Sequence, residues 1–255
     1  MSELTYSTII RLAKLGFRAL GQRFDVTGVE HLPRAGGALL ASNHIGYVDF
    51  VYGGLPAAMI DRRVRFMAKR ELFDHKLTGP IMRACRHIQV DRADGERSLA
   101  VAQEFLHRGE IVGIFPEATI SRAMEIKDLK TGAARIAAAA DVPLLPLVLW
   151  GTQRLMTKDH DRDLSRGTAI TVSVGAPVPL SGDAVADTAA LRTAMSGLLD
   201  DAIRSYPQHE PGAWWLPASY GGSAPTLEEA ARIDAEEKAA RAARKAARKA
   251  AREGA

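Results

Sequence analysis

The chain reads ALLASNHIGYVD over residues 38–49, and this stretch decides the fold that we expect. Its first five residues form a short apolar run ending in a serine, which is typical of a buried strand. His44 then lies in the loop at the carboxyl end of that strand, and Asp49 lies near the start of the next helix. Gly46 permits the turn between them. A turn is required, because five residues of uninterrupted helix would leave the two side chains roughly 140° apart.

His44 and Asp49 are the candidate catalytic residues. A neutral imidazole can accept a proton near pH 7, and a carboxylate on its other nitrogen fixes the tautomer and stabilises the cation that forms. Because the carboxylate must reach the imidazole to orient it, we predict that the two side chains are in contact. The spacing alone is a weak indication, because a chain with seven histidines has an Asp five positions after some His by chance roughly a third of the time.

The rest of the chain predicts an α/β fold with a mixed, mainly parallel sheet covered by helices. Between Arg23 and Tyr206, short apolar runs alternate with longer segments of helical period. The expected strands are Ala38 to Ser42, Val64 to Ala68, His87 to Val90, Ile111 to Phe115, Leu144 to Trp150 and Ala169 to Val174. The expected helices include Val48 to Asp61, Gly95 to His107, Thr131 to Ala140 and Thr188 to Ser205.

Polar clusters follow three of the expected strands: Asn43-His44, Asp91-Arg92, and the run from Pro116 to Thr119. The loops at the carboxyl ends of parallel strands share one edge of the sheet, where open α/β sheets bind their ligands. We therefore expect the three clusters to converge on one site.

The two ends of the chain differ from this domain, which we place at residues 23–206. Residues 1–22 predict an amphipathic helix, either packed on the domain or lying on anionic lipid. Its apolar arc contains Tyr6, Ile9, Ile10, Ala13, Phe17, Leu20 and Phe24. Residues 207–225 form an aromatic Pro/Gly strap, and residues 226–255 predict a charged Ala/Lys/Arg helix.

Composition limits the class of protein. With 255 residues, 47% hydrophobic and 25% charged, we expect one main globular domain. The single cysteine, Cys85, excludes an internal disulfide, and no secretory leader or apolar run of membrane-spanning length is expected, so we predict a cytoplasmic protein. The net charge is +4, but residues 238–252 alone carry seven basic and no acidic side chains. The rest of the chain is therefore acidic overall, which disfavours a nucleic-acid partner and favours anionic lipid near the tail.

Four ordered segments resemble the motifs of the glycerolipid acyltransferases, most closely the bacterial 1-acyl-sn-glycerol-3-phosphate acyltransferases. They are Asn43-His44 with Asp49, Val90-Asp91-Arg92, the run from Phe115 to Ser121, and the run from Val142 to Pro146. The resemblance covers roughly residues 23 to 180. Two departures stand in the third motif, where Ala118 replaces the usual glycine and Ile120 replaces the usual arginine.

The resemblance implies transfer of a fatty acyl group from acyl-CoA or acyl carrier protein to the free hydroxyl of lysophosphatidic acid, giving phosphatidic acid. It implies that His44 is the base, that Asp49 holds it, and that Arg92 binds the phosphate. Glu117 would orient the glycerol, Thr119 would add a hydroxyl, and Asn43 would be a further substrate contact. Arg122 is the candidate replacement for the missing arginine. The protein would then be peripheral on the inner face of the cell membrane.

Several other readings stay open. No histidine has metal-ligand spacing and no glycine pattern indicates a nucleotide, so we predict neither a metal nor a cofactor. Cys85 near His87 suggests a covalent acyl-enzyme, although a free cysteine is more often a small buried apolar group. The acceptor is alternatively another hydroxylated lipid. From a different class, the chain is alternatively a noncatalytic membrane adaptor, which would leave His44 dispensable.

Overall fold

The computed structural model describes residues 2–91 and 95–253, and the chain forms two compact units. The first unit contains residues up to 120 together with 126–209. The second contains residues 121–125 together with 210 onward. The second unit thus takes a five-residue insertion from the middle of the first, directly after the motif that contains Glu117 and Thr119.

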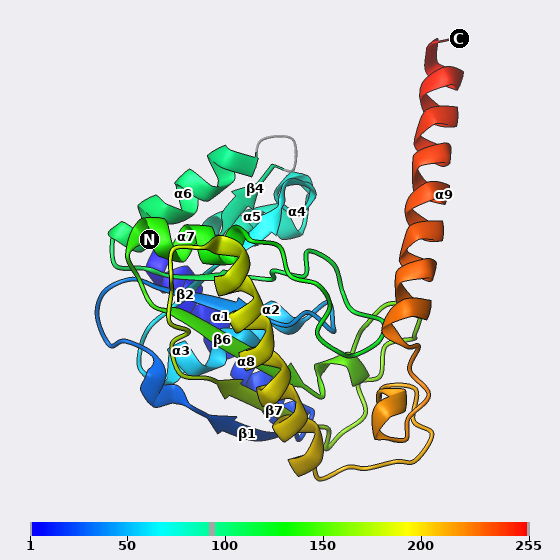
Figure 1. Ribbon diagram of the computed structural model, residues 1–255, viewed down its shortest axis with the longest axis horizontal. Coiled ribbons are helices and arrows are strands. Elements are labelled where there is room, and N and C mark those ends of the chain that lie inside the picture. Colours follow the sequence, from blue (N-terminus) through cyan, green and yellow to red (C-terminus); the bar gives the residue numbers. More distant parts are fainter. Residues whose placement is uncertain (1, 92–94, 254–255) are drawn as a thin grey trace. The chain divides into compact units, whose positions relative to one another are not determined.

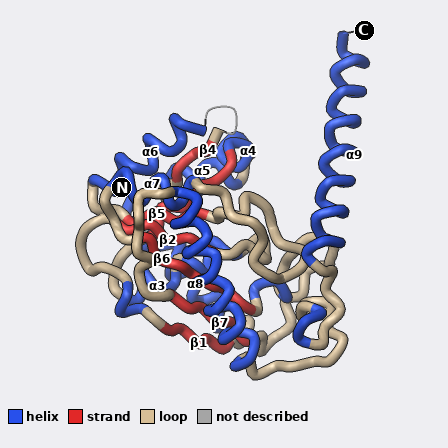
Figure 2. The backbone as a smooth tube through the Cα atoms, in the orientation of Figure 1, coloured by secondary structure: helices blue, strands red, loops and turns tan. Residues whose placement is uncertain are grey.

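The first unit is built on a seven-stranded sheet (Figures 1 and 2). In spatial order its strands are β1 (Arg23–Thr27), β7 (Ala169–Val174), β6 (Leu144–Trp150), β2 (Ala38–Ser42), β5 (Ile111–Ile114), β3 (Val64–Lys69) and β4 (Ile88–Val90). Neighbouring strands are parallel except for the antiparallel pair β6 and β7. The predicted mixed, mainly parallel sheet is therefore confirmed.

Helices surround this sheet. In chain order those of the first unit are α1 (Ser2–Ala19), α2 (Asp49–Gly53), α3 (Leu55–Met59), α4 (Arg70–Asp74), α5 (Thr78–Ala84), α6 (Gly95–His107), α7 (Gly132–Ala140) and α8 (Ala184–Ser205). Short 3-10 turns occur at η1 (Val29–His31) and η2 (Thr152–Arg154), with η3 (Ala218–Tyr220) in the second unit. Helix α8 runs along β6 and β7 (Figure 1). No helix in the described part of the chain is long and apolar enough to cross a membrane.

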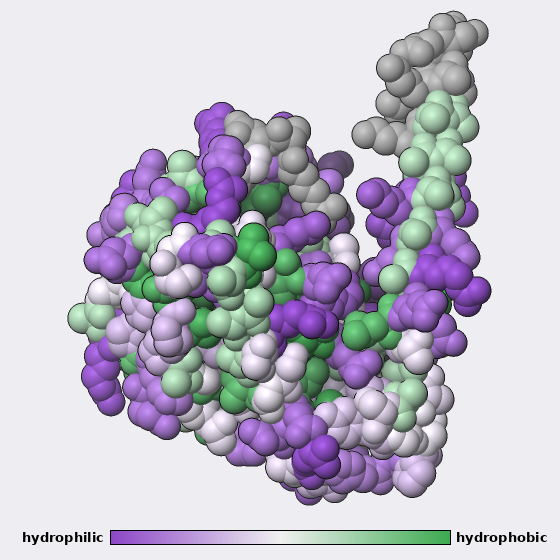
Figure 3. All heavy atoms as spheres, in the orientation of Figure 1, coloured by the Kyte–Doolittle hydropathy of each residue, from purple (hydrophilic) through white to green (hydrophobic). Residues whose placement is uncertain are grey.

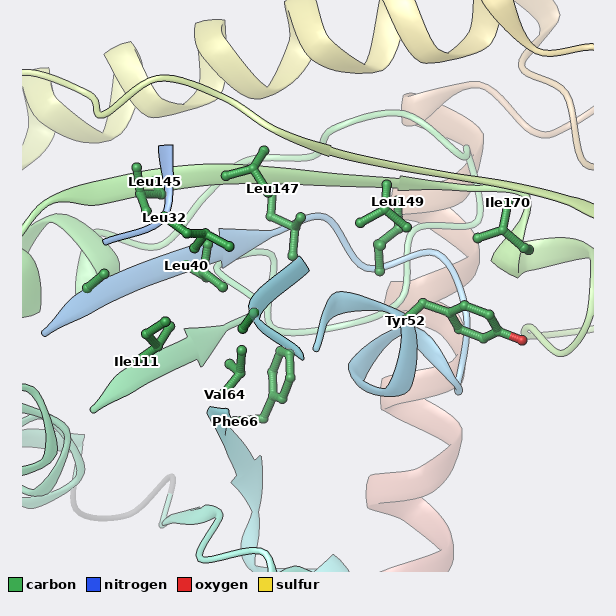
Figure 4. Packing of buried hydrophobic residues seen from close by; sticks show 14 of the residues in the cluster. Leu32, Leu40, Tyr52, Val64, Phe66, Ile111, Leu145, Leu147, Leu149 and Ile170 are labelled. Carbon is green, nitrogen blue, oxygen red and sulfur yellow. The ribbon is translucent and has the colours of Figure 1, made fainter. Parts of the chain in front are cut away.

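The core lies between the central strands and the helices. All residues of β2 and β6 are buried, because these strands are covered on both faces. Figure 4 shows Leu40, Leu147 and Phe66 from three strands, together with Tyr52 of α2, in one buried apolar cluster. Burying each such side chain stabilises the fold by about 1.5–3 kcal/mol. The loops at the end of β2 therefore start from a rigid base.

The predicted strands agree closely with the observed ones. Strands β2, β6 and β7 have the predicted bounds, and β3, β4 and β5 differ by one residue at one end. Strand β1 was not predicted. Its sequence contains Arg23, Asp25 and Thr27, and it lies at the edge of the sheet with alternating exposed side chains. Such an edge strand lacks the continuous apolar run that marks a buried one.

The helix predictions need more correction. The expected helix Val48 to Asp61 is two short helices, because Pro56, in the first turn of α3, has no N–H with which to continue the hydrogen bonding of α2. Helices α4 and α5 were not predicted. Helix α8 starts four residues before Thr188, where the Asp183 carboxylate accepts hydrogen bonds from Val185 N and Ala186 N.

The N-terminal helix is present but shorter than the predicted helix, whose apolar arc reached Phe24. It ends at Ala19, and Gly21 follows with a φ of 58°, so the chain leaves the helical direction there. Phe24 therefore belongs to β1 and not to the helical arc. It nevertheless packs against Phe17, with ring centroids 5.1 Å apart.

The second unit contains the C-terminal helix α9 (Leu227–Glu253). Its start has the expected signature, because Thr226 Oγ1 accepts from Glu229 N and the Glu229 carboxylate accepts from Thr226 N. Pale green alanines and purple charged side chains share its described surface (Figure 3). Within the same unit, Trp215 and Leu216 of the predicted strap are buried.

Candidate active site

Sheet order brings three loops together. Strand β2 lies between β5 and β6 and runs parallel to both, so all three end at the same edge. The loop with His44 therefore lies between the loop that carries Glu117 and the loop that carries Thr152.

Arg92, the predicted phosphate ligand after β4, is outside the described residues. Its neighbour Asp91 pairs with Arg70 at 3.4 Å.

The predicted contact between His44 and Asp49 is present. His44 Nδ1 is 2.9 Å from Asp49 Oδ2, and the chain turns at Gly46 between them. Asp49 is fully buried, whereas the His44 side chain is 22% exposed. Because the carboxylate accepts the Nδ1 proton, Nε2 is the ring nitrogen that remains for a substrate.

Asp49 is itself held in place by three further donors. Its Oδ2 accepts from Ile45 N at 2.7 Å and Gly46 N at 2.8 Å. Its Oδ1 accepts from Thr152 Oγ1 at 2.6 Å, in the turn after β6. These bonds compensate the burial of the carboxylate and fix its orientation. Sequence reasoning missed Thr152, because it lies 103 residues from Asp49 and belongs to no recognised motif.

Close packing explains why a glycine stands in the turn. A Cβ atom at Gly46 would lie 3.0 Å from Met156 O and 3.1 Å from Thr152 O. The turn also donates Tyr47 N to Met156 O at 2.9 Å. The loop from His44 to Asp49 therefore packs tightly against the segment after β6, which leaves little room for a side chain at position 46.

Phe115 supports the imidazole from another direction. Its ring stacks on the His44 ring with centroids 4.3 Å apart and an interplanar angle of 25°. Phe66 in turn stacks on Phe115 at 5.6 Å. The imidazole is thus oriented by one hydrogen bond and one stacking contact, and it is coupled to the apolar core.

Glu117 ties the second loop to the first. Its Oε1 accepts from the backbone N of His44 at 2.9 Å, and its Oε2 accepts from the backbone N of Lys127 at 3.3 Å. The side chain is 6% exposed. Burial raises the pKa of this carboxyl from 4.5 to about 7, although the two backbone donors and the charge of Lys127 act in the opposite direction.

The residues after Glu117 form a tight turn. Ala118 has a φ of 61°, in the left-handed region that favours glycine, at the position where the family motif usually has glycine. Thr119 follows with an exposed side chain, and its Oγ1 accepts a hydrogen bond of 2.6 Å from Lys127 Nζ. Lys127 is a second site residue that sequence reasoning missed.

Two predicted substrate contacts have other partners. Asn43 is buried, and its amide bridges both backbone groups of Leu149, donating from Nδ2 at 3.0 Å and accepting at Oδ1 at 2.8 Å. We correct its role to joining β2 and β6. Arg122 is buried in the second unit, where it pairs with Asp234 and, at 2.9 Å, with Glu237. This pairing balances its charge within that unit, so we do not assign Arg122 to the phosphate.

The acyl-enzyme alternative loses support from the surroundings of Cys85. Burial raises the pKa of its thiol, which disfavours the nucleophilic thiolate. His87 accepts a hydrogen bond from Phe66 N on Nδ1, and burial together with the charge of Arg65 lowers its pKa to about 4. Both residues line an apolar groove. Residues of α1, α2, α3 and α5 form its other walls, and it holds about 580 Å³ of space, including the part open to solvent.

Known proteins resemble this chain in sequence and in fold. Residues 23–150 match the model of the family described as Acyltransferase. A 1-acyl-sn-glycerol-3-phosphate acyltransferase of Bacillus subtilis (strain 168) is 37% identical over 123 residues, which are 48% of this chain and 60% of the relative. The 1-acyl-sn-glycerol-3-phosphate acyltransferase alpha of Mus musculus is 31% identical over 188 residues, covering 72% of this chain and 65% of the relative. The chain therefore spans about three fifths to two thirds of the length of these two relatives.

A solved structure supports the fold. The crystal structure of the 1-acyl-sn-glycerophosphate (LPA) acyltransferase PlsC from Thermotoga maritima matches with a TM-score of 0.65 and 22% identity. The match covers 79% of this chain and 81% of that one. The family model spans half of this chain, including His44, Asp49 and Glu117. The chain belongs to the Acyltransferase family.

Proposed function

We propose that this chain transfers a fatty acyl group from an acyl thioester, acyl-CoA or acyl carrier protein, to the free hydroxyl of 1-acylglycerol-3-phosphate, giving phosphatidic acid for phospholipid synthesis. The observation that carries this proposal is the 2.9 Å contact between His44 Nδ1 and Asp49 Oδ2. It supplies an oriented base on a partly exposed ring. The names of the similar bacterial and mouse proteins suggest the acceptor.

The reaction follows from this geometry. His44 Nε2 takes the proton of the acceptor hydroxyl while the hydroxyl oxygen attacks the thioester carbonyl. Asp49 stabilises the imidazolium that forms. The C–S bond then breaks, and the thiolate takes the proton back from His44, which restores the neutral imidazole. A thiol leaves readily, since its pKa is about 8.5, so the main task of the protein is to activate the alcohol.

Other residues have supporting roles in the proposal. Glu117 orients the glycerol through the loop that it joins to His44, and Thr119 offers an exposed hydroxyl at the same rim. Arg92 binds the acceptor phosphate, because a guanidinium suits phosphate oxygens in a bidentate geometry. Because proton transfer by His44 and a good leaving group account for the chemistry, we propose that no metal or other cofactor takes part.

We also propose that the protein works at the inner face of the cell membrane, on anionic lipid. Leu12 and Leu15 of α1 are 62% and 63% exposed, next to the exposed cation Lys14. Leu77 and Ile81 are exposed on and beside α5, which packs against α1. Apolar side chains flanked by cations suit the interface of an anionic monolayer.

The lipid contact is tested by sedimentation with vesicles of phosphatidylcholine and phosphatidylglycerol. The double substitution Leu12→Ser with Leu15→Ser is expected to weaken binding, because it removes the exposed apolar anchors. The control is Leu164→Ser, at another exposed leucine, in a loop. Equal binding of all three proteins would contradict the assignment of this surface.

The catalytic proposal is tested by thiol release from acyl-CoA in the presence of 1-acylglycerol-3-phosphate, with the product identified by mass. His44→Ala is expected to lower the rate by about 100- to 10,000-fold. His107→Ala, at an exposed position in the last turn of α6, is the matched control and keeps the wild-type rate. Equal rates for wild type and His44→Ala would favour the adaptor function. An acceptor panel that yields another acylated lipid would select the other acceptor class.

A further inference from the structure

The side chain of Lys127 lies back across the loop that starts with the Glu117 motif. Its Nζ donates to Thr119 Oγ1 at 2.6 Å and to Ile120 O at 3.3 Å. Its backbone N donates to Glu117 Oε2 at 3.3 Å. Glu117 Oε1 in turn accepts from His44 N, so one carboxyl group connects the backbones of His44 and Lys127. An ammonium is therefore joined by direct contacts to the loop that carries the base.

This cation acts on the site electrostatically. Its charge is one of the influences that lower the pKa of Glu117 against the larger effect of burial. Thr119 Oγ1 and Ile120 O, which accept hydrogen bonds from the ammonium, are a hydroxyl and a carbonyl oxygen. The neighbouring side chain of Ile120 is buried and apolar, so it offers no charge at this point of the motif.

The position of Lys127 is fixed from outside the loop. Arg192 of α8 donates from Nε to Lys127 O at 3.2 Å and from Nη2 to Ile126 O at 3.4 Å. Lys127 is half-buried and Thr119 is exposed, so the ammonium and the hydroxyl lie at a rim that solvent reaches. A donor held in place before binding loses less conformational entropy when it receives a ligand.

We propose that Lys127, together with the Thr119 hydroxyl, binds the anionic headgroup of the acceptor and selects acceptors that carry a phosphate. This inference rests on the proposed acyl transfer and names a specificity residue for it. A phosphate at this rim receives charge-assisted hydrogen bonds from the ammonium. An acceptor without phosphate forms no such bonds, so the charge of Lys127 does not raise its affinity. The effect therefore belongs to acceptor binding and not to the proton transfer at His44.

The test compares 1-acylglycerol-3-phosphate with 1-acylglycerol, which lacks the phosphate, in detergent micelles with acyl-CoA. Lys127→Met keeps the length of the side chain and removes its charge. It is expected to raise KM for the phosphate acceptor by about 10- to 100-fold, with kcat and the neutral acceptor nearly unaffected. Lys127→Arg keeps the charge and is expected to retain a KM near that of wild type. Lys130→Met, at an exposed lysine in the same loop, is the matched control.

Binding without turnover separates this inference from the proposed function. In a His44→Ala background, titration with 1-acylglycerol-3-phosphate is expected to show the same loss of affinity on adding Lys127→Met. An equal loss for both acceptors would indicate a purely structural role and overturn the inference. Unchanged affinity for the phosphate acceptor would overturn it while leaving the acyl transfer intact. A protein that neither binds nor acylates this acceptor would overturn both.

Discussion

Glu117 provides a sharp test of how burial acts on the site, through the substitution Glu117→Gln. The carboxyl is buried, and both of its oxygens face backbone N–H donors, His44 N at 2.9 Å and Lys127 N at 3.3 Å. A glutamine keeps the shape of the side chain and cannot ionise, but its Nε2 cannot accept from one of these two N–H groups, which costs about 1–3 kcal/mol at every pH. The part of the stability difference that changes with pH therefore reports the ionisation of the wild-type carboxyl.

The magnitude follows from the pKa. Burial raises the pKa of Glu117 from 4.5 in the unfolded chain to about 7 in the folded one. Between these values the folded state holds a proton that the unfolded state has released, so stability falls as the pH rises through this window and levels off above about 7. A difference from 4.5 to about 7 corresponds to about 3 kcal/mol, most of which lies between pH 5 and pH 8.

The assay is urea unfolding of wild type and Glu117→Gln at pH 5 and pH 8. Between pH 5 and pH 8 the wild type should lose about 2–3 kcal/mol of stability relative to the variant, whatever constant difference the substitution causes. Comparing the two proteins cancels the contributions of all other titrating groups. Glu104→Gln, at an exposed glutamate of α6, is the control and should follow wild type at both pH values. If wild type and Glu117→Gln lose the same stability between pH 5 and pH 8, the reasoning about burial is refuted.

Three further substitutions test the site. Asp49→Asn keeps an oxygen for His44 but removes the charge that stabilises the imidazolium, so turnover should fall by about 100- to 10,000-fold with the fold intact by circular dichroism; unchanged turnover would contradict its role. Thr152→Val leaves Asp49 Oδ1 without its 2.6 Å donor, so it should lower the free energy of unfolding by about 1–3 kcal/mol and also lower kcat. A variant with the stability and kcat of wild type would disprove this role. Ala118→Gly should raise the free energy of unfolding by about 0.5–1 kcal/mol, because glycine adopts the φ of 61° without strain; a loss of stability would count against it.

Local patterns in the sequence were sufficient for much of the fold. Strands β2, β6 and β7 were predicted with their observed bounds, because each is an apolar run that recognisable breaks delimit. The contact of His44 with Asp49 was also predicted, since a glycine between them permits the turn that lets the two side chains meet. Where the local signal was weak, as in the polar edge strand β1, the prediction failed.

What the sequence by itself determined was the α/β class, the central strands and the pairing of His44 with Asp49, because each depends on neighbours along the chain. Only the tertiary structure decided that Thr152 anchors Asp49, since that contact depends on which strand ends are adjacent. It likewise decided that Lys127 lies beside Thr119, since that contact depends on how the loop after β5 folds back on itself. It also decided that the pKa of Glu117 is raised and that Asn43 joins two strands. Desolvation and contacts between distant segments exist only once the chain has folded, so no local pattern records them.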